Sequence, residues 1–262
     1  MTRVIKIGGR AQSNPRLATL LAAANRQRPG TADAQQRTES LCVVHGGGDE
    51  VSALQRRLGL EPRFVGGRRV TTTEDLEIVR MVLSGSTNKR LVAQLLGAGV
   101  RAIGISGEDA SLFTATPIDV ATMGRVGGAV TVDPEVVQLL CAAGFVPVVS
   151  PLAREAGGEG AGLNVNGDDA AAALAVALSA SELLLVVDVD GVLVSGVAVA
   201  ALDVSRAHEL IASGEATGGM AAKLQAAEHA IQGGVAVVRI ASIDGIRDPR
   251  AGTRIVPSHT TV

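Results

Sequence analysis

The stretch LNVNGDDAAAALAVALSASELLLVVDVDG, residues 163–191, decides the fold, because it predicts a loop, a helix, a buried strand and a second loop in direct succession. Its first turn holds two amides and two carboxylates, Asn164, Asn166, Asp168 and Asp169. They stand before an alanine-rich helix, where unpaired backbone N–H groups and the positive end of the helix dipole face outward. Such a turn can bind an anion and orient a lysine. A plainer interpretation is that Asn164 and Asp168 only cap the helix.

The apolar run at residues 183–187 predicts a buried parallel strand. It delivers Asp188 and Gly191 to its carboxyl end, where open α/β sheets bind ligands, although Asp188 also suits the start of an ordinary turn. Further buried strands are expected at residues 3–7, 41–44, 101–105, 145–149 and 235–240. Strands that alternate with helical segments in this way indicate an α/β fold with a mainly parallel sheet.

The charge balance argues against two classes of partner. The 262 residues include 24 Lys and Arg against 26 Asp and Glu, so no basic field favours nucleic acid or an anionic membrane. No apolar run reaches roughly 18 residues and no signal-peptide pattern opens the sequence, so we expect a cytoplasmic protein that binds small molecules.

The composition also limits the chemistry. Cys42 and Cys141 lie in apolar runs and are expected to be core residues, and four scattered histidines offer no metal-ligand spacing. The chain has no Trp or Tyr and only three Phe, so it has no aromatic platform for bases or sugars. Its 32 glycines point instead to contacts made by the backbone.

Two glycine turns follow predicted strands. In KIGG, residues 6–9, Gly8 and Gly9 can bring backbone N–H groups close to a phosphate beside the charge of Lys6, although a plain tight turn explains them as well. In HGGG, residues 45–48, three glycines stand directly between strand and helix. Their cost in chain entropy favours close approach of a ligand to the backbone.

Residues 63–72, RFVGGRRVTT, predict a hairpin or a gate over a pocket. Arg68 and Arg69 are adjacent, so in a strand only one of them faces inward, and both suit a solvated surface equally well. The spacing of Thr72 and Asp75 predicts a capping box, which opens a helix through residue 83 and a second one to residue 96. Asn88 is expected on the surface of that element, next to Lys89.

The remaining segments carry fewer signals. Residues 27–40 are expected to form a surface loop, residues 112–132 inserted hairpins, and residues 253–256 a last edge strand. One charged residue in the C-terminal part stands near a helix start: Lys223 lies in the first or second turn of a helix expected to run to residue 232. A lysine near a helix N-terminus is unfavourable for the dipole, which favours an anionic partner by less than about 1 kcal/mol.

Six motifs taken in order resemble the amino acid kinase family. They are KIGG at 6–9, HGGG at 45–48, GGRRVT at 66–71, LNVNGD at 163–168, DVDGV at 188–192 and GGMAAK at 218–223. The resemblance covers nearly the whole chain. It implies a three-layer αβα sandwich in a single domain, residues 1–262. The N-terminal lobe, about residues 1–160, would bind an acyl amino acid, and the C-terminal lobe, about residues 161–262, would bind ATP.

The activity that the resemblance implies is phosphorylation of the side-chain carboxylate of an N-acylated glutamate by ATP. Phosphoryl transfer requires positioning and positive charge more than a strong base, which agrees with paired lysines and no catalytic histidine. Mg²⁺ would be held mainly by the ATP oxygens, because the sequence shows no all-protein metal site.

The resemblance also implies a role for individual residues. Lys6 and Lys223 would neutralise charge on the transferring phosphoryl group, and Asp168 would hold both lysines. The acyl amino acid would be bound by Gly47, Gly48, Arg69 and Asn164. The nucleotide would be bound by Gly8, Gly9, Asp188, Gly191, Gly219 and Met220.

The chain departs from the family pattern at several points. Arg10 follows KIGG where a small residue is usual, Gly167 replaces an alanine, and the segments at 191–218 and 243–256 look short. By the same resemblance we expect a homodimer without arginine feedback. The alternatives are a kinase for N-succinylglutamate or for carrier-linked aminoadipate or glutamate, and a regulator that binds nucleotide or amino acid without transfer. An aspartokinase or a nicotinamide-dependent oxidoreductase fits the sequence less well.

Overall fold

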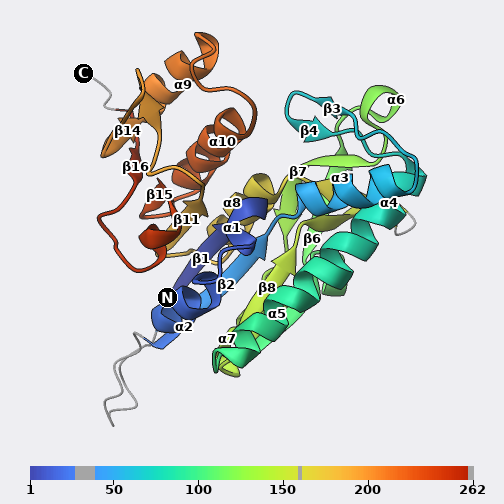
Figure 1. Ribbon diagram of the computed structural model, residues 1–262, viewed down its shortest axis with the longest axis horizontal. Helices are drawn as coiled ribbons and strands as arrows, with labels where there is room; N and C mark the ends of the chain where they lie inside the picture. The colour runs from blue at the N-terminus through green and yellow to red at the C-terminus, as the bar shows by residue number, and fades with distance from the viewer. Residues whose placement is uncertain (27–38, 159–160, 259–262) are drawn as a thin grey trace.

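The computed structural model describes residues 1–26, 39–158 and 161–258, and its centre is an eight-stranded sheet (Figure 1). The strand order is β14-β16-β15-β11-β1-β2-β8-β5. Every neighbouring pair is parallel except β15 and β16. The strands are β1 (Thr2–Ile7), β2 (Ser40–His45), β5 (Ala102–Ser106), β8 (Val146–Ser150), β11 (Glu182–Val186), β14 (Ala201–Asp203), β15 (Val238–Ala241) and β16 (Thr253–Val256).

Helices cover both faces of this sheet because its central strands are apolar on both sides. On β1, Val4 joins one buried cluster, while Ile5 and Ile7 join the other. The Val4 cluster includes helices α7 (Glu135–Ala142), α8 (Gly167–Ala177), α9 (Val204–Ala212) and α10 (Gly218–Gln232). The opposite cluster includes α2 (Leu17–Arg26), α5 (Asn88–Gly97) and the short 3₁₀-helix η3 (Ile243–Ile246). The three-layer α/β sandwich with a mainly parallel sheet is therefore confirmed.

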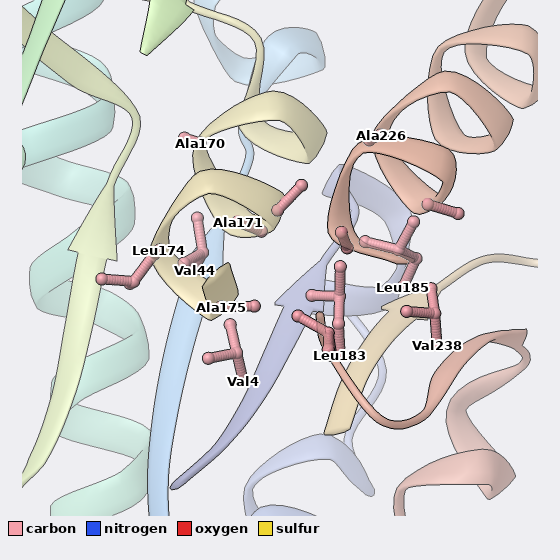
Figure 2. Close-up of a cluster of buried hydrophobic side chains, with 14 of the residues drawn as sticks. Val4, Val44, Ala170, Ala171, Leu174, Ala175, Leu183, Leu185, Ala226 and Val238 are labelled. Carbon is pink, nitrogen blue, oxygen red and sulfur yellow. The ribbon is translucent and has the colours of Figure 1, made fainter. Parts of the chain in front are cut away.

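Small side chains bring α8 close to the centre of the sheet. Ala170, Ala171 and Ala175 on α8 are fully buried together with Val4 and Leu183. Figure 2 shows these side chains packed between α8, α10 and the central strands. The predicted apolar strand is β11, which lies between β1 and β15. The first turn of α8 thereby reaches the carboxyl end of β1.

A second, smaller sheet supports the site from the side. Strands β6 (Phe113–Pro117), β7 (Val126–Val132), β9 (Leu152–Glu155) and β10 (Gly162–Val165) form a closed barrel. The hairpins expected at 112–132 are thus confirmed, and they include the short helix α6 (Val120–Met123). The 3₁₀-helix η2 (Asp109–Ser111) leads into them. β10 leads directly into α8 and carries Asn164.

The predicted capping box at Thr72 and Asp75 is confirmed at the start of α4 (Thr73–Arg80). α4 continues through a π-helical segment, η1 (Met81–Thr87), into α5. The expectation that Asn88 lies on the surface is wrong, because its side chain is fully buried and donates hydrogen bonds to His45 Nε2 (3.0 Å) and the Val148 carbonyl (2.9 Å). Lys89 is exposed, as predicted.

Several further boundaries differ from the sequence-based expectations. β16 is not an edge strand, because it lies between β14 and β15 and leaves β14 at the edge. The sequence predicts a helix that begins with Asn14 as its cap and Pro15 in its first turn, but a short helix, α1 (Gly9–Gln12), precedes these residues and α2 follows at Leu17. Asn14 accepts a hydrogen bond from the Arg16 amide in between. Asn166, not Asn164 or Asp168, caps α8. The loop expected at 27–40 lies largely outside the described residues.

The helix after the HGGG turn and the hairpin within residues 63–72 match their predictions. α3 (Gly48–Arg57) follows HGGG, and strands β3 (Phe64–Val65) and β4 (Arg68–Arg69) form the predicted hairpin. Strands β12 (Leu193–Val194) and β13 (Val197–Ala198) form another hairpin after β11. Cys42 and Cys141 are buried, as expected of core residues. Across the described ranges, no helix has the length and hydropathy needed to cross a membrane.

Candidate active site

Two lysines meet one carboxylate at the carboxyl end of the sheet. Lys6, from β1, places its Nζ 2.8 Å from Asp168 Oδ1, and Lys223, from the second turn of α10, places its Nζ 3.3 Å from Asp168 Oδ2. The three side chains are 8%, 14% and 5% exposed in the order Lys6, Lys223, Asp168. Three residues distant in sequence thus form one buried charged cluster with a net positive charge.

The pKa directions follow from this geometry. Burial alone would raise the pKa of Asp168, but the attraction of Lys6 and Lys223 outweighs it and leaves the pKa below its ordinary value. Burial and the nearby charge of Lys6 lower the pKa of Lys223, against the pull of Asp168. Asp168 is therefore ionised at neutral pH, and one carboxylate offsets only part of the charge of two lysines. An anion placed between the lysines would supply the missing negative charge.

A cavity of about 160 Å³ opens beside this cluster. All four residues predicted for the acyl amino acid line it, together with the first residue of α8. Its wall is largely apolar, from side chains of α3, α4, η1 and the small barrel. The residues that line it are Gly46, Gly47, Gly48, Val51, Phe64, Gly67, Arg68, Arg69, Val79, Leu83, Val126, Pro151, Asn164, Val165, Asn166 and Gly167.

Arg69 is the buried cation of this cavity. Its Nη2 donates to the Gly48 carbonyl and to Ser52 Oγ, both at 2.7 Å, and its Nη1 donates to Gln55 Oε1. The Phe64 ring lies over the guanidinium at 4.8 Å. A guanidinium has five N–H groups, so Arg69 retains two for a ligand beyond the bonds found among the described residues. Of the two adjacent arginines, Arg69 is buried and Arg68 is partly buried, and both line the cavity, so the prediction that only one faces inward is wrong.

Backbone geometry explains the glycine turn on the same wall. Gly47 has a φ of +151°, and a β-carbon there would come within 2.6 Å of Leu83 Cδ2. Gly48 begins α3, so the free N–H groups of that helix face the cavity. Asn164 donates through Nδ2 to Thr71 Oγ1 at 3.0 Å, which holds its amide at the cavity wall.

The residues predicted for the nucleotide are not among those that line the cavity. Gly8 caps α1, directly after β1. Gly219 and Met220 lie in the first turn of α10, and the Gly219 carbonyl accepts a hydrogen bond from Lys223 Nζ at 3.4 Å. A β-carbon at Gly9 would lie 3.8 Å from Asp49 Oδ2, on α3.

Asp188 and Gly191 lie in the loop after β11. Asp188 Oδ2 is 3.7 Å from Arg10 Nη1, and both side chains are more than half exposed. Gly191 has a φ of +147°, and a β-carbon there would meet Thr253 Oγ1 at 2.6 Å. Packing against β16 is therefore enough to require a glycine at 191, with or without a nucleotide. Arg10 points toward this loop and not into the buried cluster.

Sequence reasoning missed a set of buried hydrogen bonds that hold the glycine turn from behind. His45 Nδ1 lies 2.8 Å from the Gly46 carbonyl and must donate to it, while His45 Nε2 accepts from Asn88. Gln12 Nε2 donates to the same carbonyl at 2.9 Å. Burial lowers the pKa of His45 to about 4, so the ring is neutral. The signal in the sequence was His45 itself, the polar first residue of HGGG at the end of an apolar strand.

A second unpredicted contact joins the β3–β4 hairpin to α8. Arg68 Nη1 lies 2.6 Å from Asp169 Oδ2. Burial raises the pKa of Asp169, which the charge of Arg68 partly offsets. The sequence offered both residues as candidates, but nothing in their spacing of 101 positions paired them.

The described residues offer no cluster of three or more His, Cys, Asp or Glu side chains that could hold a metal ion. At the centre of the site, both oxygens of Asp168 face lysines. A divalent cation bound there would have to displace one of the two lysines. The donor set therefore suits an anion better than a metal ion held by the protein.

Known proteins resemble this chain over most of its length. The family model described as the amino acid kinase family matches residues 1–242. An acetylglutamate kinase of Chloroflexus aurantiacus is 42% identical over 255 residues, which cover 96% of this chain and 95% of the relative. An acetylglutamate kinase of Rubrobacter xylanophilus is 44% identical over 234 residues, 89% of this chain and 86% of the relative.

A solved structure gives the same result for the fold. The protein smu.665 of Streptococcus mutans superimposes with a TM-score of 0.83 at 28% identity, over 97% of this chain and 98% of that one. The similarity thus extends through both the cavity side and the helix that carries Lys223.

Proposed function

The chain belongs to the amino acid kinase family, and from that premise we propose that it is an acetylglutamate kinase. It transfers a phosphoryl group from ATP to the side-chain carboxylate of N-acetyl-L-glutamate, which yields N-acetyl-L-glutamyl 5-phosphate in arginine biosynthesis. The observation that carries this proposal is the buried cluster of Lys6, Asp168 and Lys223 beside a small cavity.

The cluster supplies what phosphoryl transfer requires. The acceptor carboxylate is already ionised at neutral pH, so no strong base is needed. The transferring group instead carries negative charge on its equatorial oxygens, which fixed cations stabilise. Lys6 and Lys223 are held in place by Asp168, so little reorganisation is needed when the phosphates enter. We assign all three residues to catalysis.

On the cavity side, we assign Gly47, Gly48, Arg69 and Asn164 to the acyl amino acid. Arg69 has two N–H groups that make no hydrogen bond within residues 1–26, 39–158 and 161–258, and a planar guanidinium suits the shape of the α-carboxylate. The amide N–H groups at the start of α3 would meet the side-chain carboxylate or the phosphoryl oxygens. The apolar wall and the volume of about 160 Å³ support a small neutral acyl group over a carrier protein or a second carboxylate.

On the other side, we assign Gly8, Gly9, Asp188, Gly191, Gly219 and Met220 to the nucleotide. The start of α10 would place backbone N–H groups near the phosphates, and Lys223 would follow one turn later. Mg²⁺ would arrive with ATP and be held by phosphate oxygens, since the oxygens of Asp168 are engaged by the lysines.

The two lobes follow from these assignments. The N-terminal lobe, about residues 1–160, would bind the acyl amino acid, and the C-terminal lobe, about residues 161–262, would bind ATP. Residues 164–167 are shared, because they line the cavity from β10 and the start of α8. We further propose a homodimer in the cytoplasm, as family membership implies.

The test is trapping of the acyl phosphate. The protein is incubated with Mg-ATP and hydroxylamine, with N-acetylglutamate, N-succinylglutamate, free glutamate and aspartate in parallel, and hydroxamate and ADP are measured. Hydroxamate from N-acetylglutamate alone is the expected result. Hydroxamate from N-succinylglutamate alone would overturn the acyl assignment. ATP binding without hydroxamate from any acceptor would favour a carrier-linked substrate or a regulator.

A further inference from the structure

The β3–β4 hairpin contacts three different parts of the site through three successive residues. At Gly67, a β-carbon would lie 3.6 Å from the backbone of Gly218, at the start of α10. Arg68 pairs with Asp169 on α8. Arg69 bonds to Gly48, Ser52 and Gln55 on α3. This short hairpin therefore touches the helices of both the cavity side and the nucleotide side.

The hairpin has little stability of its own. Its ladder consists of two residue pairs, Phe64 with Arg69 and Val65 with Arg68. Phe64 and Val65 are 55% and 49% exposed, so neither is anchored in a core. An isolated two-stranded hairpin is marginal at best in water. Its position over the cavity, which Phe64 and Gly67 help to line, comes from the contacts of its arginines and from the buried residues that follow it, Val70 and Thr71.

The first turn of α8 carries two consecutive carboxylates, and each contacts different cations. Asp168 faces Lys6 and Lys223, while Asp169 faces Arg68. The Arg68 and Asp169 side chains are 27% and 23% exposed, so water screens their attraction only in part. Because Asp168 and Asp169 are consecutive residues of one helical turn, α8 links the catalytic cluster directly to the hairpin.

We propose that Arg68 and Asp169 are a positioning pair, which fixes the β3–β4 hairpin, and with it Arg69, to the helix turn that carries Asp168. The inference rests on the proposed function, since Arg69 is the assigned ligand of the α-carboxylate. Without the pair, the hairpin loses its tie to α8, and Arg69, still bonded to α3, is positioned less tightly in the cavity. The contacts of Asp168 with the lysines remain. The loss therefore falls on KM for the acyl amino acid and not on kcat.

The experiment compares Arg68→Gln, Asp169→Asn and the double variant with the wild type, and measures kcat and KM for N-acetylglutamate and for ATP. Each single substitution should raise the acyl-amino-acid KM about three- to tenfold, as expected for a partly buried ion pair. The double variant should be no worse than either single one, because both remove the same interaction. Arg63→Gln is the matched control: Arg63 lies at the same hairpin, is exposed, and makes no ion pair within the described residues.

Hydrogen exchange of the amides at residues 64–70 gives a second readout that needs no activity. Exchange should quicken in all three variants of the pair and stay at the wild-type rate in Arg63→Gln. Unchanged KM and unchanged exchange would overturn the inference, and so would single effects that multiply in the double variant. A wild type that forms no hydroxamate would instead overturn the proposed function, while the exchange rates still report on the hairpin.

Discussion

The two sides of the lysine cluster are built differently. The cavity side holds its key cation, Arg69, through buried hydrogen bonds that the guanidinium donates to Gln55 and Ser52. The nucleotide side offers glycines and helix starts, and its charged pair of Arg10 and Asp188 is largely solvated. The fixed side chains of the cavity side can select a ligand by its shape and charge. The backbone N–H groups of the nucleotide side bind phosphates, which many ligands share. Substitutions should therefore act differently on the two sides.

The largest effect is expected at the centre, where both sides meet. Lys223→Ala should lower kcat by about 10²–10³-fold, because a fixed charge that faces the transferring phosphoryl group is removed. Steady-state rates with N-acetylglutamate and ATP measure this loss. The melting temperature should stay close to that of the wild type, since Lys223 contributes no apolar core. Retention of the wild-type kcat would show that Lys223 lies outside the catalytic cluster.

A second effect tests the buried hydrogen bonds of His45 behind the glycine turn of the cavity side. His45 has a pKa of about 4 in the fold and an ordinary value of 6.5, so between these pH values the unfolded chain binds a proton that the native protein does not. As the pH falls from 6.5 to 4, the wild type should lose about 3 kcal/mol of unfolding free energy through this group. His45→Gln should lack that loss. Urea unfolding at several pH values measures both slopes, and parallel curves would contradict the prediction.

The next substitution separates the two sides by ligand. Arg69→Gln should raise KM for N-acetylglutamate about thirtyfold, or about 2 kcal/mol, because hydrogen bonds to a charged group are lost. KM for ATP should change little. An increase confined to ATP would mean that the assignments of the two sides are reversed.

The smallest effects compare one glycine from each side. Gly47→Ala should destabilise the protein by about 1–2 kcal/mol, since it adds strain at a positive φ and a contact with Leu83. Gly219→Ala adds only a contact at 3.9 Å with Lys223 Nζ. It should leave the unfolding free energy unchanged and raise KM for ATP about threefold by obstructing the phosphates. Equal destabilisation by both substitutions would remove the distinction between the two sides.

Local patterns predicted most of this arrangement. The strand at 183–187, the capping box at Thr72 and the glycine turn after β2 all follow from residue types within a few positions. Lys6, Asp168 and Lys223 were brought together by the family resemblance, and the structure places the Nζ of each lysine within 3.3 Å of a carboxylate oxygen of Asp168. Parallel strands explain this meeting, because their carboxyl ends share one edge of the sheet.

What could not be predicted depends on long-range packing. Asn88 looked like a surface residue, but the π-helical turn before it rotates the helix and directs its amide at His45. The pairing of Arg68 with Asp169 joins segments with no common pattern. The sequence of β16, TRIV, alternates like that of an edge strand, and only the path of the chain places it inside the sheet and antiparallel to β15.

That strand order has a consequence for synthesis on the ribosome. β1 is made first, yet its neighbour β11 is complete only when residue 186 has been added. β14 cannot pair until residues 253–256, which form its partner β16, have been synthesised. The half that contains β2, β5 and β8 can pair its strands much earlier. The nascent chain therefore carries one unpaired edge of β1 through most of translation, and slow closure of such distant contacts is the step most exposed to aggregation.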